Sequence, residues 1–454
     1  MTQLAEEKLT YLSNFSRIEK QVGGSGRMWL DKTRKAAMDR FAEVGFPSNK
    51  LEEWRFTNVA PLAKVPFKPA PRVDLLPDDV AGFTFGHDAA AELVFVNGHF
   101  AANLSITRSL PRGAKVLSFG SALEEIPDLL EQHLTRYADV NANPFVALNT
   151  GFIHDGAVVY LPKNTTVDLP IHLMFVSVPG SEPAVAHPRV LFVADDNVEA
   201  TLVKSFVSTR AGVIFDNVLT EMVVGDRSRV DHNKLQQDSA DGFHISTTQV
   251  KLGKAAQFIS HSATLGGKLT RNDVNVLLAG DRADATLNGL VVIGRDQHCD
   301  NHTLLEHLAP NCPSYELYKH VLSDRATGVF KGKIYVHPEA QKTDSKQASK
   351  SLLMSDDAQM NSQPALEIYA DDVKCTHGST TGPIEEEFVF YLQSRGVSLD
   401  AARHLLTYAF AADVTRRIKV EPVRRRIENI MAAQHGLPQD LRITDLGEHD
   451  EAVL

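Results

Sequence analysis

The chain has 454 residues, of which 43% are hydrophobic and 23% are charged. This composition is typical of folded globular proteins and excludes a wholly disordered chain. The length leaves room for about two to four domains, or for one large repeat body. The formal net charge of −10 disfavours a general nucleic-acid-binding surface, because phosphate backbones attract basic proteins.

The cysteines and the N-terminal residues point to a reducing compartment. The chain's cysteines are Cys299, Cys312 and Cys375, an odd and sparse set that does not suit a disulfide framework. The first residues carry neither the basic nor the apolar region of a secretory signal. No apolar run reaches the roughly 18 residues of a membrane-spanning helix. We therefore expect a cytoplasmic protein that associates with neither membrane nor nucleic acid.

Residues 1–160 are expected to form an N-terminal domain of helical and mixed structure. Apolar residues at helical spacing over 31–44, followed by Gly45 and Pro47, predict a helix that ends there. Further along, the sequence predicts a proline-rich linker near 61–77, a strand over 92–97 and a helix near 122–139.

The texture changes over 161–396, where short Val, Ile, Leu and Thr runs alternate with Gly, Asp and Asn. A similar string, an apolar run followed by a turn and a small residue, starts at residues 193, 224, 252, 279, 322 and 354. The starts are 27 to 32 residues apart except for one interval of 43, which indicates an insertion or an unrecognised coil. Repeats of this length with short strands predict a β-solenoid of about seven coils, in which stacking buries the apolar face of each coil.

A β-sandwich with regularly spaced turns is the alternative fold. The solenoid is favoured because the turns share a sequence as well as a spacing. Stacked open coils leave an unpaired strand edge at each end of the body. Such an edge must be capped or paired with another chain.

Helical periodicity returns over 397–437, which is expected to form a C-terminal helical domain. A second helix there is predicted over 421–435, with Pro422 in its first turn and Gly436 after its end. The tail over 438–454 is acidic. The apolar stripe of the first helix comprises Leu399, Ala402, Leu405, Leu406, Ala409, Phe410 and Val414.

The chain lacks the glycine-rich loops that hold nucleotides. Its nearest string, Gly328 to Ile334, has one spacer too few for a phosphate-binding loop and no Ser or Thr after the lysine. No Gly-x-Gly-x-x-Gly motif follows a predicted strand. We therefore expect that the chain itself binds neither ATP nor a dinucleotide.

Two short segments hold candidate metal ligands. In a strand, His298, Asp300 and His302 share one face and could bind zinc or iron, although a polar ladder is the favoured interpretation without a fourth ligand. Cys375 and His377 also share a face and suit iron, zinc or copper(I). Two ligands do not close a site, so a cluster held there needs ligands from another chain. The residues alone favour a buried cysteine and a hydrogen-bonded histidine at this second segment.

Two further features have both structural and partner-binding interpretations. The triplet Arg424, Arg425 and Arg426 is expected on a solvated helix face, with docking of an acidic partner as the alternative. Trp54 is expected to anchor packing rather than to contact a partner.

A set of longer motifs resembles one known family. The motifs are Thr303 to Cys312, Gly328 to Ile334, Ala340 to Gln347, Glu367 to Gly378 and Phe390 to Gly396. In this order they resemble the SufB/SufD family of iron–sulfur cluster assembly proteins. Within that family, the segment Leu51 to Thr57 and the small number of cysteines are similar to the SufD type rather than the SufB type.

The resemblance implies a right-handed parallel β-helix core between N- and C-terminal helical domains. It also implies a complex of one SufB-type subunit, one SufD-type subunit and two SufC-type ATPase subunits, with sulfur supplied by a cysteine desulfurase and its sulfur carrier. The terminal strands of the β-helix are expected to pair with those of the SufB-type subunit. In this complex the chain is expected to be a non-catalytic scaffold that supports de novo cluster assembly and iron acquisition.

The resemblance also assigns roles to residues. It implies that His377, with Cys375 beside it, lies at the interface with the SufB-type subunit and shares a transient iron–sulfur cluster with it. This reverses the interpretation from the residues alone. The ATPase is expected to dock on the C-terminal helices, through a region that includes Leu405, Leu406, Phe410, Arg424 and Arg425.

Two other functions remain as alternatives. A SufB-like subunit that assembles the cluster as a homodimer is disfavoured by the cysteine count. A β-helix carbohydrate enzyme is disfavoured because such enzymes are typically secreted and need clustered carboxylates on one face.

Overall fold

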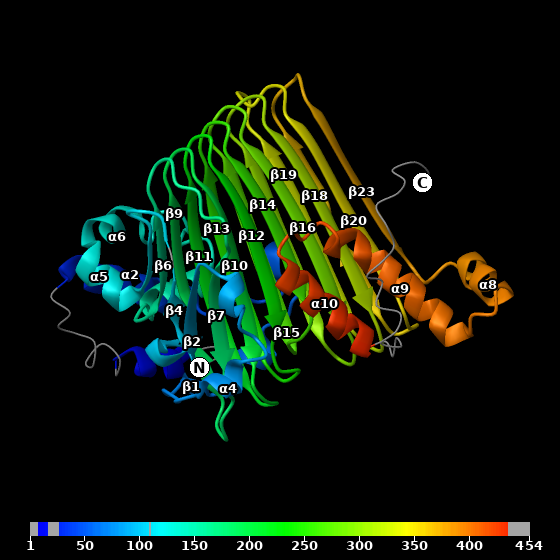
Figure 1. Ribbon diagram of the computed structural model, residues 1–454, viewed down its shortest axis with the longest axis horizontal. Coiled ribbons are helices and arrows are strands. Elements are labelled where there is room, and N and C mark those ends of the chain that lie inside the picture. The colour runs from blue at the N-terminus through cyan, green and yellow to red at the C-terminus, as the bar shows by residue number, and fades with distance from the viewer. Residues whose placement is uncertain (1–7, 17–26, 109, 435–454) are drawn as a thin grey trace.

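The computed structural model describes residues 8–16, 27–108 and 110–434. Its body is a β-solenoid of about eight turns, with helices toward both ends of the chain (Figure 1). Successive strands alternate between two sheets from β9 (Arg189–Ala194) to β20 (Asp344–Leu353), so each turn adds one strand to each sheet. The predicted mainly β solenoid is confirmed, and the β-sandwich alternative is wrong.

Nearly all neighbouring strands in the two sheets run parallel. The antiparallel pairs lie near the N-terminus, where β2 pairs with β3 and β4, and β5 pairs with β6. The first sheet contains, in spatial order, β21 (Gln359–Ser362), β19 (Thr327–Val336), β17 (His298–His307), β15 (Leu269–Leu278), β13 (Phe243–Leu252), β11 (Ile214–Val224), β9, β6 (Gly156–Leu161) and β5 (Lys115–Ser118), with β1 (Lys68–Pro69), β8 (Ala184–Ala186) and β22 (Ala365–Ile368) beside this row. The second sheet contains β23 (Lys374–Gly382), β20, β18 (Pro313–Leu322), β16 (Asp284–Ile293), β14 (Gln257–Thr264), β12 (Arg229–Gln237), β10 (Glu199–Ser208), β7 (Ile171–Ser177), β2 (Ala91–Val96) and β3 (His99–Phe100), with β4 (Ile106–Thr107) beside β2.

The 43-residue interval in the repeat has a simple structural cause. The strings that start at 193, 224, 252 and 279 lie in turns after first-sheet strands, whereas those at 322 and 354 follow second-sheet strands. The interval therefore passes from one row of turns to the other. The turn that the pattern missed lies between β17 and β18, where the Asn311 side chain donates to Asp281 Oδ1 of the neighbouring turn at 2.8 Å.

The residues in this row of turns explain why the pattern was incomplete. One residue in each turn has a left-handed backbone, a conformation that favours glycine. These residues, with their φ angles, are Asn164 (62°), Asn197 (58°), Arg227 (59°), Ala255 (52°), Arg282 (61°), Asn311 (60°) and Lys342 (61°). Because none of them is glycine, no single residue type marks the turns in the sequence.

The space between the two sheets, called the lumen below, holds the main apolar core. Buried side chains from successive coils meet there, among them Phe192, Val218, Phe258, Leu305 and Phe330. A single coil could not remove these side chains from water, so the stacking of coils is what stabilises the body.

The N-terminal part covers one end of the solenoid (Figure 1). Its first long helix ends where the sequence predicts, because Gly45 follows Val44 with a φ of 67°. The strand predicted over 92–97 is β2. The elements are α2 (Met28–Val44), η1 (Glu52–Trp54), α3 (Ala60–Ala63), α4 (Pro77–Val80), η2 (Gly86–Asp88), η3 (Ala102–Leu104), α5 (Phe119–Glu125), α6 (Pro127–His133) and α7 (Pro144–Gly151).

The prediction of a single helix near 122–139 is wrong. Two short helices, α5 and α6, occupy part of this range, because Pro127 lacks a backbone N–H and begins the second of them. The proline-rich segment expected near 61–77 packs in part against the solenoid. Within it, β1 pairs with β8, and Phe67 is fully buried.

The C-terminal part contains α8 (Glu386–Ser394), α9 (Leu399–Thr415) and α10 (Glu421–Gln434). Helices α9 and α10 pack on the outer face of the second sheet, whereas α8 projects beyond the last coil (Figure 1). Helix α10 begins at Glu421 as predicted. Its predicted end at 435, Gly436 and the acidic tail over 438–454 lie outside the described residues.

Candidate functional site

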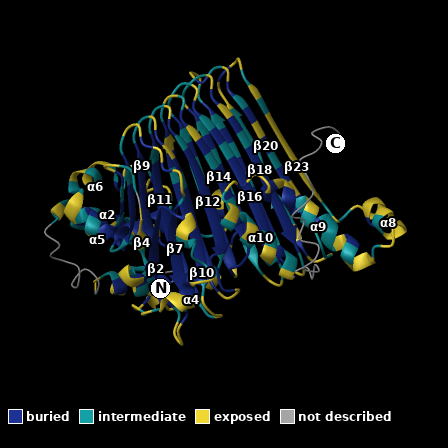
Figure 2. Cartoon of the chain, viewed as in Figure 1, coloured by how far each residue is buried: buried dark blue, intermediate teal, exposed yellow. Residues whose placement is uncertain are grey.

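The last strand of the second sheet, β23, is an open edge. It pairs with β20 along one side, and no other strand of the described chain pairs with its other side. Seven of its nine residues are exposed, so it forms an exposed margin of the solenoid (Figure 2). A long exposed edge strand presents unpaired N–H and C=O groups to any strand that can pair with it.

Cys375 and His377 lie on this edge strand, at the end of the lumen. They stack in register on Ser345 and Gln347 of β20, whose side chains are buried. Since parallel strands in register keep side chains on the same face, Cys375 and His377 also face the lumen side. The hydrogen bond from Ser379 Oγ to Ser362 Oγ of the first sheet, at 2.9 Å, agrees with that direction.

The two predicted ligands differ in accessibility. His377 is exposed, whereas Cys375 is half-buried against the apolar core. Burial raises the pKa of the Cys375 thiol, so the free thiol stays protonated at neutral pH. The imidazole of His377 is therefore the more available ligand, and two ligands from this chain do not close a metal site.

The C-terminal helices bring together only some of the predicted docking residues. Leu405 and Leu406 line a cavity of about 640 Å³ next to Leu392 of α8. Phe410 instead holds α9 on the solenoid, because Lys319 Nζ lies 4.4 Å from its ring centroid and donates to its backbone oxygen at 2.9 Å.

The arginine triplet is also divided in its contacts. Arg425 is exposed and forms an ion pair with Glu421 at 2.8 Å, while Arg424 is half-buried. Arg426 turns toward the solenoid and donates to Gln237 and to the backbone oxygen of Gly82. The triplet therefore does not form one continuous basic patch.

The exposed aromatic residues of α8 were not among the predicted site residues. Phe388, Phe390 and Tyr391 are 52%, 72% and 53% exposed. The sequence could have indicated this exposure. A helix with Phe-Val-Phe-Tyr has apolar residues on more than one face and cannot bury them all against one neighbour. This surface adjoins the cavity lined by Leu392, Leu405 and Leu406.

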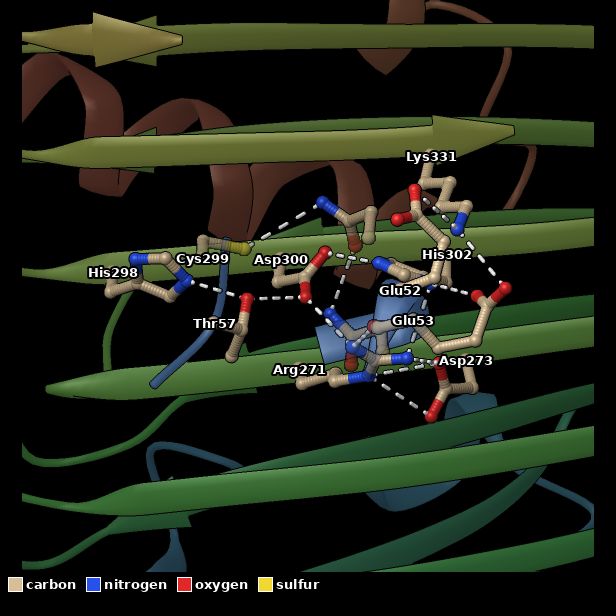
Figure 3. Close-up of polar contacts among 12 residues, drawn as sticks. Glu52, Glu53, Thr57, Arg271, Asp273, His298, Cys299, Asp300, His302 and Lys331 are labelled. Carbon is tan, nitrogen blue, oxygen red and sulfur yellow. Dashed lines mark hydrogen bonds and ion pairs between the residues drawn. The ribbon is translucent and has the colours of Figure 1, made fainter. Parts of the chain in front are cut away.

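Other side chains of the same chain hold His298, Asp300 and His302 in place (Figure 3). Asp300 contacts Arg271 at 3.0 Å and His302 at 3.0 Å. Although burial opposes ionisation, His302 and Arg271 hold the pKa of Asp300 well below its usual range. The guanidinium of Arg271 also lies 3.7 Å from the Trp54 ring centroid. The cluster thus joins the N-terminal segment to the first sheet, and Trp54 is the packing anchor that the sequence predicts.

Two family models together match most of the chain. A model described as "SUF system FeS cluster assembly, SufBD core domain" matches residues 176–410, and a model of the SufBD protein N-terminal region matches residues 5–173. The chain belongs to the SufBD family.

Individual relatives within the SufBD family agree with this assignment. A SufBD family protein of Synechocystis sp. is 32% identical over 91% of this chain and 93% of the relative. The iron–sulfur cluster assembly protein SufD of Escherichia coli is 29% identical over 86% of this chain and 89% of the relative. SufD of Bacillus subtilis is 26% identical over 93% and 96%. The chain is thus a SufD-type member of the family.

No helix in the described part of this SufBD family member is long and apolar enough to cross a membrane.

A buried polar ladder lies beneath His377 in the SufBD core domain. In register, His377 stacks on Gln347, and Gln347 stacks on Glu316 of β18. Gln347 Nε2 donates to Glu316 Oε2 at 2.6 Å, and both side chains are buried. Burial raises the pKa of Glu316 to about 7. The ladder places a titratable carboxyl group two coils below the exposed imidazole.

Replacing Glu316 by glutamine is expected to stabilise the protein at neutral and higher pH. Because its pKa rises from 4.5 to about 7 on folding, the folded protein keeps this proton after the unfolded chain has lost it. Wild-type stability should therefore fall as pH rises through that interval and then level off. The Glu316→Gln variant avoids this loss, which is about 3 kcal/mol. Urea unfolding of the wild type and the variant, below and above this pH interval, measures the loss. A stability difference between the two proteins that does not change with pH would contradict this expectation.

Proposed function

We propose that this chain is a non-catalytic scaffold subunit in which β23 pairs with the terminal strand of a SufB-type subunit. The observation that carries the proposal is the exposed nine-residue edge of β23, on which Cys375 and His377 face the lumen. Pairing would satisfy the unpaired backbone groups of the edge and continue the sheet into the partner.

At this junction His377 would share an iron–sulfur cluster with a cysteine of the SufB-type subunit. The neutral imidazole offers one nitrogen to iron, and its exposed position lets a ligand from the other chain complete the site. Cys375 lies two residues away on the same face and would be a second, less accessible ligand. A site divided between two chains suits a cluster that has to be released to other proteins.

The C-terminal helices would bind a SufC-type ATPase. The cavity at Leu405 and Leu406, together with the exposed aromatic residues Phe388, Phe390 and Tyr391 of α8, forms an apolar surface that no part of the described chain covers. Arg425 would lie at the side of this contact. The chain has no phosphate-binding loop, so ATP hydrolysis would belong to this partner.

The complete assembly would hold one SufB-type subunit, one copy of this chain and two ATPase subunits in the cytoplasm. A cysteine desulfurase and its sulfur carrier would supply sulfur, and the assembly would support de novo cluster formation and iron acquisition. Movement of α8 and α9 on ATP hydrolysis would be passed to the edge strand, because α9 is attached to β18 through Lys319.

The His377→Ala variant tests this function. The chain is co-expressed anaerobically with the SufB-type and SufC-type proteins of the same source, and iron and acid-labile sulfide are measured in the purified complex. The expected result is a complex of unchanged composition with at least tenfold less cluster, because a ligand has been removed from the interface. The control is Thr376→Ala, which changes an exposed residue on the opposite face of β23. Equal cluster content in wild type and His377→Ala would contradict the proposed role of His377.

A further inference from the structure

We propose that the interior of the solenoid contains a second metal site, formed by Asp216, Asp238 and His244, that binds a divalent transition-metal ion such as Zn²⁺ or Fe²⁺. The three residues lie far from β23, so this inference does not depend on the proposed function. The carboxylate oxygens and the imidazole nitrogen that could ligate an ion all lie within 4.8 Å of one another.

The fold brings these residues together from both sheets. Asp216 of β11 and His244 of β13 are register neighbours on adjacent strands of the first sheet. Asp238 immediately follows β12 of the second sheet, at the start of the turn that leads into β13. The site therefore lies at a corner of the lumen, where a turn crosses from one sheet to the other.

The three side chains are withdrawn from water and only partly satisfied. Their exposed fractions are 4% for Asp216, 7% for Asp238 and 0% for His244. Neither oxygen of Asp238, nor Nδ1 of His244, has a hydrogen-bond partner of acceptable geometry within the described residues, although Nδ1 and Oδ2 are only 2.9 Å apart. Buried polar atoms in this state are costly unless a ligand completes their interactions.

Neighbouring residues orient two of the three candidate ligands. Ser177 Oγ of β7 donates to Asp216 Oδ2 at 2.8 Å, which leaves the other carboxylate oxygen of Asp216 for an ion. Lys234 Nζ lies 2.9 Å from His244 Nε2, and the opposite ring nitrogen, Nδ1, faces Asp238. For Nδ1 to ligate an ion, Nε2–H must donate to Lys234 in its neutral amine form. Hydrogen bonds to the outer atoms of ligating carboxylates, such as the one from Ser177, are typical of metal sites.

The charges of the cluster also favour a cation. Two carboxylates face one another across a buried space, and the Lys234 nitrogen contacts the imidazole at Nε2, the ring nitrogen that does not face Asp238. Two buried carboxylates this close repel one another unless a proton or a cation lies between them. An ion between them would relieve this repulsion and connect β11, β13 and the turn after β12.

The donor set indicates which ions fit. One imidazole nitrogen and two carboxylate oxygens suit Zn²⁺ or Fe²⁺, whereas Mg²⁺ and Ca²⁺ prefer ligand sets made of oxygen alone. Three protein ligands would leave one position for water.

A Zn²⁺ titration of the full chain tests this site. The parent protein carries Cys375→Ser and His377→Ala, which remove the candidate ligands at the edge strand, and it is first stripped with a chelator. We expect it to bind one Zn²⁺ and to gain thermal stability with Zn²⁺ but not with Mg²⁺. The same titration with Fe²⁺ under anaerobic conditions is expected to give the same stoichiometry.

Asp238→Asn is the decisive variant. It keeps the shape of the side chain and removes both a ligand charge and a like-charge repulsion, so the variant should fold and yet bind Zn²⁺ more than about 100-fold more weakly. Asp216→Asn is the second variant and should lose binding in the same way. The matched control is Asp231→Asn, another buried aspartate of β12 outside the cluster, which should bind Zn²⁺ as the parent does. A parent that binds no Zn²⁺, or an Asp238→Asn protein that binds as well as the parent, would overturn the proposal.

Discussion

Replacing Ser379 by proline is expected to abolish pairing with the SufB-type subunit while leaving the isolated chain folded. Lys374 N–H donates to the backbone oxygen of Thr343, just before β20, at 2.8 Å. In a parallel ladder the N–H groups of alternate residues point to the same side, so Ser379 N–H points away from β20 and toward the open edge. Proline at this position removes an outward donor and adds a ring where the partner strand would lie, yet it breaks no hydrogen bond to β20.

The measurement is co-purification of the tagged chain with the SufB-type protein. Ser379→Ala is the matched control, because it removes the same hydroxyl group but keeps the backbone N–H, and it should pair as the wild type does. Circular dichroism and thermal melting of each isolated chain establish that the fold is kept. If Ser379→Pro folds normally and still binds the SufB-type subunit, β23 is not the pairing edge.

Glu221→Ala is expected to lower the free energy of unfolding by about 3–5 kcal/mol. Glu221 and Arg189 form an ion pair inside the protein, where their exposed fractions are 0% and 1%. Glu221 also accepts hydrogen bonds from the backbone N–H groups of Thr135 and Tyr137, each at 2.8 Å, and of Ala138 at 3.1 Å. Alanine would leave the buried Arg189 guanidinium without its counter-charge and three backbone amide donors without their acceptor.

Urea unfolding followed by tryptophan fluorescence measures this loss. Trp29 and Trp54 are the chain's tryptophans and both lie in the N-terminal part, which Glu221 joins to the solenoid. Glu221→Gln keeps part of the acceptor capacity and should fall between alanine and wild type. Glu367→Ala, which breaks an ion pair with Lys333 at the surface, should cost at most about 1 kcal/mol. Similar losses for Glu221→Ala and Glu367→Ala would show that the buried pair contributes little.

The fold class could be predicted because the information is local and repeated. Each coil places a short apolar run in each sheet and a polar turn between them, and this pattern recurs along the chain. The two rows of turns could not be told apart in the sequence, since their left-handed positions hold Asn, Arg, Ala, Lys and Asp rather than glycine. The prediction of one helix failed because Pro127 begins a second helix, so α5 and α6 are separate.

The candidate edge site could be predicted for a similar reason. Cys375 and His377 are two residues apart, so their common face follows from strand periodicity alone. Packing on the last coil, which decides that His377 is exposed and Cys375 half-buried, is a property of the folded body. Likewise, only the structure shows that Lys319 packs against the Phe410 ring and so attaches α9 to the solenoid.

The buried polar residues of the lumen could not be predicted. Asp216, Asp238 and His244 lie in successive segments of one coil and its neighbour, and no motif spacing connects them. In a half-buried sheet, alternating polar residues would face water, as strand periodicity suggests. In this solenoid one face of each sheet points into the lumen, and the helices α9 and α10 cover part of the outer face of the second sheet. Polar residues on both faces therefore become buried.

The most direct test of the proposed scaffold role is the native mass of the complex formed by this chain with the SufB-type and SufC-type proteins of the same source. We expect a four-chain particle with one SufB-type subunit, one copy of this chain and two ATPase subunits. Recovery of this chain only as a monomer or a homodimer, with the SufB-type protein in a separate particle, would contradict the scaffold role.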